Sequence, residues 1–109
     1  MKRSLLLTMT LPLILALALG ATAARGGDTA AGEERYAVNC VNCHGRTGKG
    51  MASFPALIGR DADYISDRLL QYRAREMVGP NSAIMMSLAA DLTDEEIANL
   101  AAYVSTTFP

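Results

Sequence analysis

Cys40-Val41-Asn42-Cys43-His44 is the stretch of sequence that decides the fold. It contains both cysteines and the only histidine of the 109-residue chain. Side chains three and four positions apart lie on the same face of a helix. The two thiols and the imidazole are therefore expected to point in one direction and to address a single flat partner.

Three other uses of this pattern fit the chain less well. A thioredoxin-like Cys-x-x-Cys follows a strand in an α/β pattern, and no segment of this sequence reads as a convincing strand. A structural zinc site needs four ligands, more than this stretch provides. A disulfide between Cys40 and Cys43 would close too small a loop to add much stability. The pattern instead predicts c-type haem attachment, in which both thiols form thioethers with the haem vinyl groups and His44 binds the iron.

The first residues have the layout of a secretory signal peptide. Lys2 and Arg3 precede an apolar run over residues 5–19, and Ala21-Thr22-Ala23 offers a small-residue cleavage site. The apolar run is shorter than the roughly 20 residues that cross a bilayer as a helix, which favours cleavage over a retained membrane anchor. We expect a periplasmic protein without a membrane span after cleavage, with a signal peptide over residues 1–23, a short leader over 24–29 and one domain over 30–109.

The size and charge of the cleaved chain narrow the possibilities further. Cleavage after Ala23 leaves 86 of the 109 residues, with eight basic side chains against eleven acidic ones. An acidic balance gives no support to nucleic-acid binding, which normally needs a basic stripe. A domain this small seldom builds a sufficient core without disulfides, a metal or a cofactor. Because the two cysteines form no disulfide framework, a bound group is expected to complete the core.

Two helices are expected in the first part of the domain. One covers residues 30–39 behind Asp28 or Thr29 as the N-cap. The other covers residues 62–75 behind Asp61, with an apolar stripe at helical spacing formed by Ile65, Leu69 and Tyr72.

A third helix has the clearest signal. Thr93-Asp94-Glu95-Glu96 is a capping box, and Ile97, Leu100, Ala101 and Val104 then form one apolar stripe. Residues 45–59 and 79–92 are expected to be loops. The fold class is all-α, with long loops that need a group to wrap around.

The second axial ligand of the iron has to come from another residue type, because His44 is the only histidine. The candidates are Met51, Met77, Met85 and Met86, with Lys49 as an outside possibility. Met51 follows His44 closely and is expected on the same side of the haem, and Met77 ends a helix as a core residue. Met85 and Met86 lie in the expected loop, where a flexible backbone would bring sulfur to iron, and both stay open at this point.

Several further stretches resemble the class I cytochromes c, and especially the bacterial monohaem type that is similar to one half of the tandem dihaem cytochromes c. Gly32 and Tyr36 precede Cys40 as a glycine and an aromatic do in that family, and Leu100-Ala101-Ala102-Tyr103 resembles the motif of its last helix. The resemblance covers nearly the whole cleaved chain. It implies the cytochrome c fold, with three main helices whose long loops wrap around one covalent haem and with a close helix crossing at Gly32.

The same resemblance suggests roles for individual residues. The stretch 54–59 resembles the bacterial members, which places Leu57 at the haem and Arg60 on a haem propionate. Counting seven residues back from Leu92 selects Met85 as the axial ligand. Ala52 stands where the family usually has a proline whose carbonyl accepts the hydrogen bond of the proximal histidine.

The function implied is electron transfer through a His/Met-ligated haem, with no catalysis by the chain itself. The expected partners are redox proteins, namely a dehydrogenase, an oxidase or a reductase. Two versions are compatible with the resemblance: a soluble shuttle, or the haem subunit of a dehydrogenase beside a flavoprotein subunit, as in flavocytochrome c sulfide dehydrogenase. The alternative from another class is a five-coordinate haem sensor or ligand-binding protein. A peroxidase is disfavoured because the sequence offers no distal acid–base pair.

Overall fold

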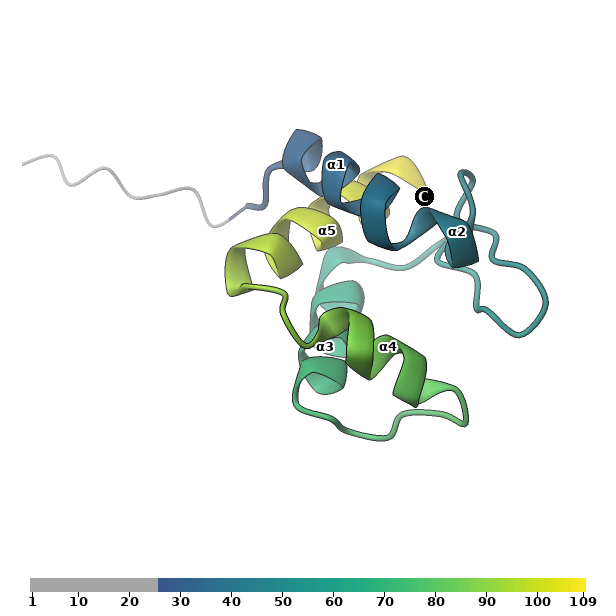
Figure 1. Cartoon of the computed structure of the whole chain (residues 1–109). Coiled ribbons are helices and arrows are strands. Elements are labelled where there is room, and N and C mark those ends of the chain that lie inside the picture. Colours follow the sequence, from purple (N-terminus) through teal and green to yellow (C-terminus); the bar gives the residue numbers. More distant parts are fainter. Residues whose placement is uncertain (1–25) are drawn as a thin grey trace, which may run out of the picture.

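The computed structural model describes residues 26–109, and this part of the chain is helical without a sheet (Figure 1). The elements in chain order are α1 (Thr29–Asn39), α2 (Val41–His44), α3 (Ala62–Arg73), α4 (Ser82–Ala89) and α5 (Asp94–Thr107). The three predicted helices are α1, α3 and α5, and the all-α prediction is confirmed. The predicted signal peptide over residues 1–23 lies outside the described residues.

Helices α1 and α5 cross closely at Gly32, as the sequence predicts. A Cβ atom on Gly32 would overlap the backbone oxygen of Asn99 and lie 2.7 Å from Cβ of Tyr103. The Asn99 side chain also accepts a hydrogen bond of 2.7 Å from the backbone N–H of Asp28. Only glycine lets the two backbones approach this far.

Three aromatic rings close the core beside this crossing. Tyr36 of α1 lies 5.4 Å from Tyr103 and 5.5 Å from Phe108 between ring centroids. The Tyr36 hydroxyl donates a 2.6 Å hydrogen bond to the carbonyl of Gly45, and the Phe108 carbonyl accepts one of 3.0 Å from the N–H of Gly59. The aromatic cluster thus fixes both ends of the loop that follows the Cys-His stretch.

Helix α3 begins as expected and ends two residues earlier than expected. The carboxylate of Asp61 accepts a 2.7 Å hydrogen bond from the N–H of Tyr64 and caps the first turn. The last helical residue is Arg73, because Arg75 takes a left-handed backbone conformation with φ 64°. A residue with positive φ cannot continue a right-handed helix.

The capping box of α5 is formed in both directions. The N–H of Glu96 donates to the hydroxyl of Thr93 over 3.1 Å, and the N–H of Thr93 donates to the Glu96 carboxylate over 3.1 Å. Arg73 joins α3 to this helix start, donating to the Leu92 carbonyl over 3.0 Å and to Asp94 over 2.6 Å. The apolar stripes of α3 and α5 pack against each other and form the core. Its buried side chains include Ile65, Leu69, Ile97, Leu100, Ala101 and Val104.

The prediction of a loop over residues 79–92 is wrong, because Ser82–Ala89 forms α4. The hydroxyl of Ser82 accepts hydrogen bonds from the N–H groups of Val78 and Gly79, at 2.9 and 2.8 Å, and so fixes the turn before the helix. The run that follows is rich in alanine, methionine and leucine, which favour helix. Met85 and Met86 therefore sit at successive positions of a helix and face different directions.

Candidate functional site

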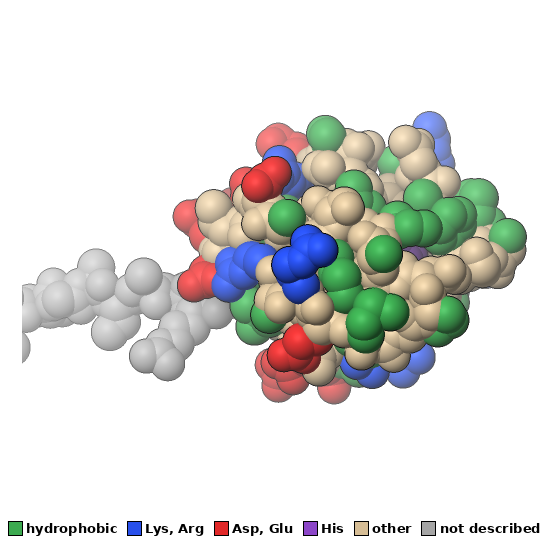
Figure 2. All heavy atoms as spheres, turned by 60° about the horizontal axis from the view of Figure 1, so that its bottom comes forward, with side chains coloured by type: hydrophobic (Ala, Val, Ile, Leu, Met, Phe, Trp, Pro, Cys, Tyr) green, Lys and Arg blue, Asp and Glu red, His purple; other side chains and the backbone are tan. Residues whose placement is uncertain are grey.

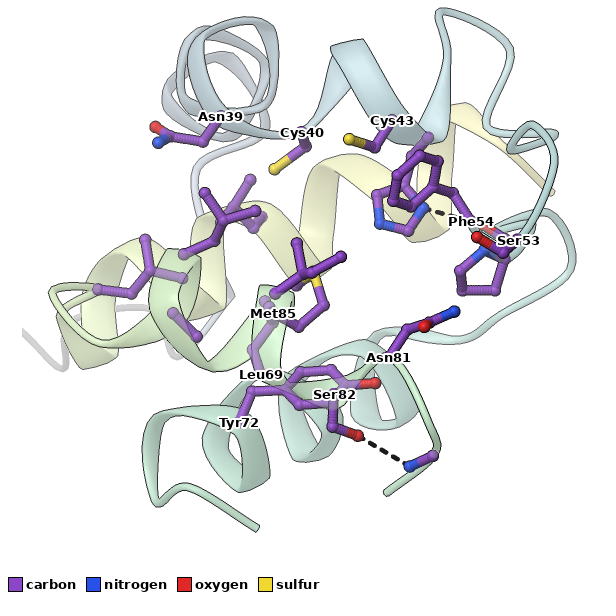
Figure 3. A pocket seen from close by; sticks show the side chains of 18 of the residues that line it. Asn39, Cys40, Cys43, Ser53, Phe54, Leu69, Tyr72, Asn81, Ser82 and Met85 are labelled. Atoms are coloured by element: carbon purple, nitrogen blue, oxygen red, sulfur yellow. Dashed lines mark hydrogen bonds between the residues drawn. The ribbon is translucent and has the colours of Figure 1, made fainter. Parts of the chain in front are cut away.

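The Cys-His stretch lies where α1 passes into α2. The N–H of His44 donates to the Cys40 carbonyl over 3.0 Å, which makes residues 40–44 one helical turn. The two cysteines are not joined by a disulfide. Figure 3 shows both sulfur atoms directed into the space between this turn and α4. The predicted common direction of the two thiols is thus observed.

His44 is buried, with 7% of its surface exposed. Its Nδ1 atom lies 2.8 Å from the backbone oxygen of Pro55. Because a carbonyl oxygen only accepts hydrogen bonds, Nδ1 carries the proton and donates it. The lone pair of the imidazole is therefore on Nε2, the arrangement found in metal-binding histidines whose orientation is fixed by a backbone carbonyl.

The carbonyl partner of His44 was expected at Ala52, and this prediction is wrong. Ala52 is an exposed turn residue with φ 49°, and Pro55 occupies the position beside the imidazole. The N–H of Leu57 donates to the Gly48 carbonyl over 2.7 Å, and this bond closes the loop that contains Pro55. A signal was present in the sequence, because Pro55 is the first proline after His44.

An apolar cavity adjoins the Cys-His turn and extends between α3, α4 and α5. It consists of a larger part of about 270 Å³ and a smaller part of about 110 Å³. Together they reach the lower end of the range of roughly 300–1,000 Å³ that is usual for small-molecule sites. The residues that border both parts are Cys40, His44, Pro55, Leu69, Tyr72, Met85 and Leu100. In the surface view, a small part of the histidine shows between hydrophobic side chains (Figure 2).

The environment of Cys40 favours the protonated, uncharged form of its thiol. Burial raises its pKa to about 11, the nearby Arg35 charge opposes this rise, and Cys43 adds to it. Nucleophilic and zinc-binding cysteines act as thiolates and need a lowered pKa. The environment of Cys40 therefore argues against a redox-active dithiol.

The methionines differ sharply in where the structure places them. Met85 borders both parts of the cavity, and Figure 3 shows it rising from α4 into the space below the two cysteines. Met86 is buried and borders neither part. Met51 and Met77 are 51% and 69% exposed. The structure brings only Met85 among these four to the cavity walls.

Arg60 and Leu57, the other predicted site residues, border the smaller part of the cavity. Arg68 borders it as well, and the sequence analysis missed this residue. The guanidinium carbon atoms of Arg60 and Arg68 lie 4.4 and 5.2 Å from the ring centroid of Tyr64. The available signal was the spacing of four between Tyr64 and Arg68 on one helix, which makes them neighbours.

The structure of residues 26–109 also bears on membrane insertion and on metal binding by clustered side chains. None of the helices in these residues combines the length and the apolar character that crossing a membrane requires. Within the same residues, no three side chains of the His, Cys, Asp or Glu type gather closely enough to hold a metal ion.

Comparison with known proteins gives consistent matches. The sequence model of the family described as cytochrome c matches residues 29–108. Cytochrome c-554(548) of Halomonas halodenitrificans is 43% identical over 81 residues, which cover 73% of this chain and 96% of that protein. The thiosulfate dehydrogenase electron acceptor of Stutzerimonas stutzeri is 39% identical over 71 residues, 64% of this chain and 33% of that protein.

A solved structure matches as well. The crystal structure of reduced cytochrome c4 from Pseudomonas stutzeri superposes with a TM-score of 0.60 at 26% identity. The match covers 73% of this chain and 50% of that one. The chain therefore spans about half the length of this larger cytochrome.

Proposed function

The chain belongs to the cytochrome c family, and on that premise we propose that Cys40 and Cys43 attach its haem and that His44 and Met85 bind the iron. Cytochromes c carry one haem c per domain of this kind, transfer electrons and act with redox partners. They are electron carriers and not enzymes. The proposal concerns which residues of this chain perform these tasks.

The observation that carries the proposal is the position of His44 and the hydrogen bond that its side chain makes. Its Nδ1–H is engaged by the Pro55 carbonyl at 2.8 Å, its ring borders both parts of the cavity, and two sulfur atoms point into the same space. With Nδ1 engaged in this way, the lone pair of Nε2 is left for a metal ion. A haem bound here provides an iron that alternates between the ferric and ferrous states.

Met85 and the cavity walls support electron transfer over ligand chemistry. A thioether ligand opposite an imidazole raises the reduction potential of haem iron. The apolar lining from Leu69, Leu100 and their neighbours limits water and so also disfavours the more highly charged ferric state. If His44 and Met85 both held the iron, oxygen or peroxide would find no free coordination site. The five-coordinate sensor is therefore the weaker alternative.

We propose that the chain is exported after cleavage of residues 1–23 and works as a small periplasmic shuttle. The match to 96% of a cytochrome of similar length supports an independent carrier. The relative named a thiosulfate dehydrogenase electron acceptor supports a dehydrogenase as the electron donor. The role as a haem subunit of flavocytochrome c sulfide dehydrogenase stays a second prediction.

Gel filtration of native extract, monitored at the haem absorption, distinguishes the two versions. A shuttle elutes alone near its monomer mass and is reduced when the separated dehydrogenase fraction and its substrate are added. Elution together with a flavoprotein would contradict the shuttle and favour the subunit. Haem that is lost from the polypeptide under denaturing conditions would contradict covalent attachment at Cys40 and Cys43.

A further inference from the structure

Two arginines lie close to one tyrosine at the smaller part of the cavity. The guanidinium of Arg60 lies 4.4 Å and that of Arg68 lies 5.2 Å from the centroid of the Tyr64 ring. All three side chains border this part of the cavity. Contacts between a guanidinium and an aromatic face are favourable, so Tyr64 holds both cations in place.

Neither arginine has a carboxylate partner in the described part of the chain. The ion pairs found there are Arg35 with Glu96 and Arg73 with Asp94. Arg68 donates instead to the neutral side chain of Gln71, over 3.0 Å. Two unpaired cations therefore stand beside an apolar cavity in a chain whose acidic residues outnumber its basic ones. This arrangement favours an anionic group between them.

The larger part of the cavity has the opposite character. Its lining contains both cysteines, His44 and Met85, but no lysine, arginine, aspartate or glutamate. A haem bears two carboxylates on one edge, and burying them against uncharged walls would be costly. The charged edge of the haem is thus assigned to the side of Arg60 and Arg68, and the uncharged edges to the side of the cysteines.

We propose that Arg68 is a second carboxylate-binding residue, which acts with Arg60 beside Tyr64 so that each haem carboxylate meets its own guanidinium. This inference rests on the proposed haem site and adds a residue that sets its reduction potential. A cation close to the iron disfavours the ferric state, which carries one more positive charge, and so raises the potential. A paired carboxylate also stays ionised in weak acid, which keeps the potential independent of pH there.

The other ionisable side chains at this part of the cavity are three tyrosines, one cysteine and one histidine. They are Tyr36 and Cys40 from α1 and its end, His44 from α2, and Tyr64 and Tyr72 from α3. Burial raises the pKa of Tyr36 to about 12 and that of Cys40 to about 11. The residues that α4 and α5 contribute here are Met85, Leu100 and Val104, which are uncharged. A potential that depends on pH in R68Q but not in R75Q is therefore assigned to the haem carboxylates.

The test is spectroelectrochemical titration of the haem-loaded protein and its R68Q variant from about pH 4.5 to 8. The matched control is R75Q, which makes the same charge change at an exposed residue that borders no part of the cavity. We expect R68Q to shift the ferric–ferrous equilibrium about tenfold toward ferric, or about 59 mV for one electron. Its potential should also rise on acidification, whereas the wild type and R75Q stay flat.

The R68K variant separates charge from packing, because lysine keeps the charge without the planar donor fork. We expect it to recover most of the potential. An R68Q potential equal to that of R75Q, with no pH dependence, would overturn the assignment of Arg68. That result would leave the haem site intact if the axial absorption bands are unchanged, whereas a wild type without covalent haem would refute the proposed function itself.

Discussion

The close crossing of α1 and α5 predicts that Gly32→Ala is one of the most damaging small changes in the chain. The added Cβ would lie 2.7 Å from Cβ of Tyr103 and would overlap the Asn99 backbone oxygen. Because carbon atoms in contact prefer about 3.5–4.0 Å, the helices would have to separate by about 1 Å. Tyr103 would move with α5 and disturb its contacts with Tyr36 and Phe108.

The loss of stability expected for Gly32→Ala follows from two opposing effects. Overpacking of a tight core costs about 1–3 kcal/mol and sometimes more, while alanine favours helix over glycine by about 1 kcal/mol. Since backbone and not a flexible side chain is the obstacle at Gly32, we expect the upper part of the range and a net loss of about 2 kcal/mol. For a domain of this size, that corresponds to a fall in Tm of about 8–16 °C.

The assay is thermal and denaturant unfolding of the haem-loaded protein, followed by circular dichroism. Gly26→Ala is the control, because a Cβ at Gly26 meets no atom within 4 Å and Gly26 borders no part of the cavity. This change should alter stability by less than about 0.5 kcal/mol. If Gly32→Ala were as stable as the control, the helices would not cross as closely as described, and the reasoning would be refuted.

Two further predictions concern local hydrogen bonds and pH. Thr93→Ala removes one half of the capping box and should cost about 1 kcal/mol in denaturant unfolding; a cost equal to zero would mean that the box contributes nothing in solution. Burial raises the pKa of Tyr36 to about 12, whereas an unfolded tyrosine titrates near 10. The stability that the protonated phenol of Tyr36 contributes is therefore fully present below about pH 10 and is lost as the pH rises toward 12. Tyr36→Phe should lose about 1 kcal/mol at neutral pH with the bond to Gly45 and should show a weaker alkaline loss than wild type, and parallel alkaline curves would contradict this assignment.

Local patterns in the sequence were enough to predict the parts of the fold that depend on neighbouring residues. The turn over residues 40–44 follows from helical spacing, and the start of α5 follows from Thr93 and Glu96, whose side chains and backbone satisfy each other within one turn. The crossing at Gly32 could be predicted only through the resemblance to a family, because nothing near Gly32 in sequence indicates that Asn99 faces it.

The sequence-based predictions failed where the position of a residue depends on how the chain folds back in space. The resemblance to the family assigned the carbonyl beside His44 to Ala52, but the turns at glycines 48 and 50 bring Pro55 there instead. Residues 79–92 were expected to form a loop, but the hydroxyl of Ser82 accepts a hydrogen bond from the N–H of Gly79 and begins helix α4 there. Arg68 was overlooked because its place at the cavity depends on how α3 packs.

The central claim is ligation of the iron by His44 and Met85, and the absorption spectrum of the ferric protein tests it most directly. A thioether ligand gives a weak sulfur-to-iron band, which we expect in the wild type and in Met86→Ala but not in Met85→Ala. The Met85→Ala protein should also bind carbon monoxide in its ferrous state without displacing a ligand. A sulfur band that survives in Met85→Ala and disappears in Met86→Ala would contradict the account.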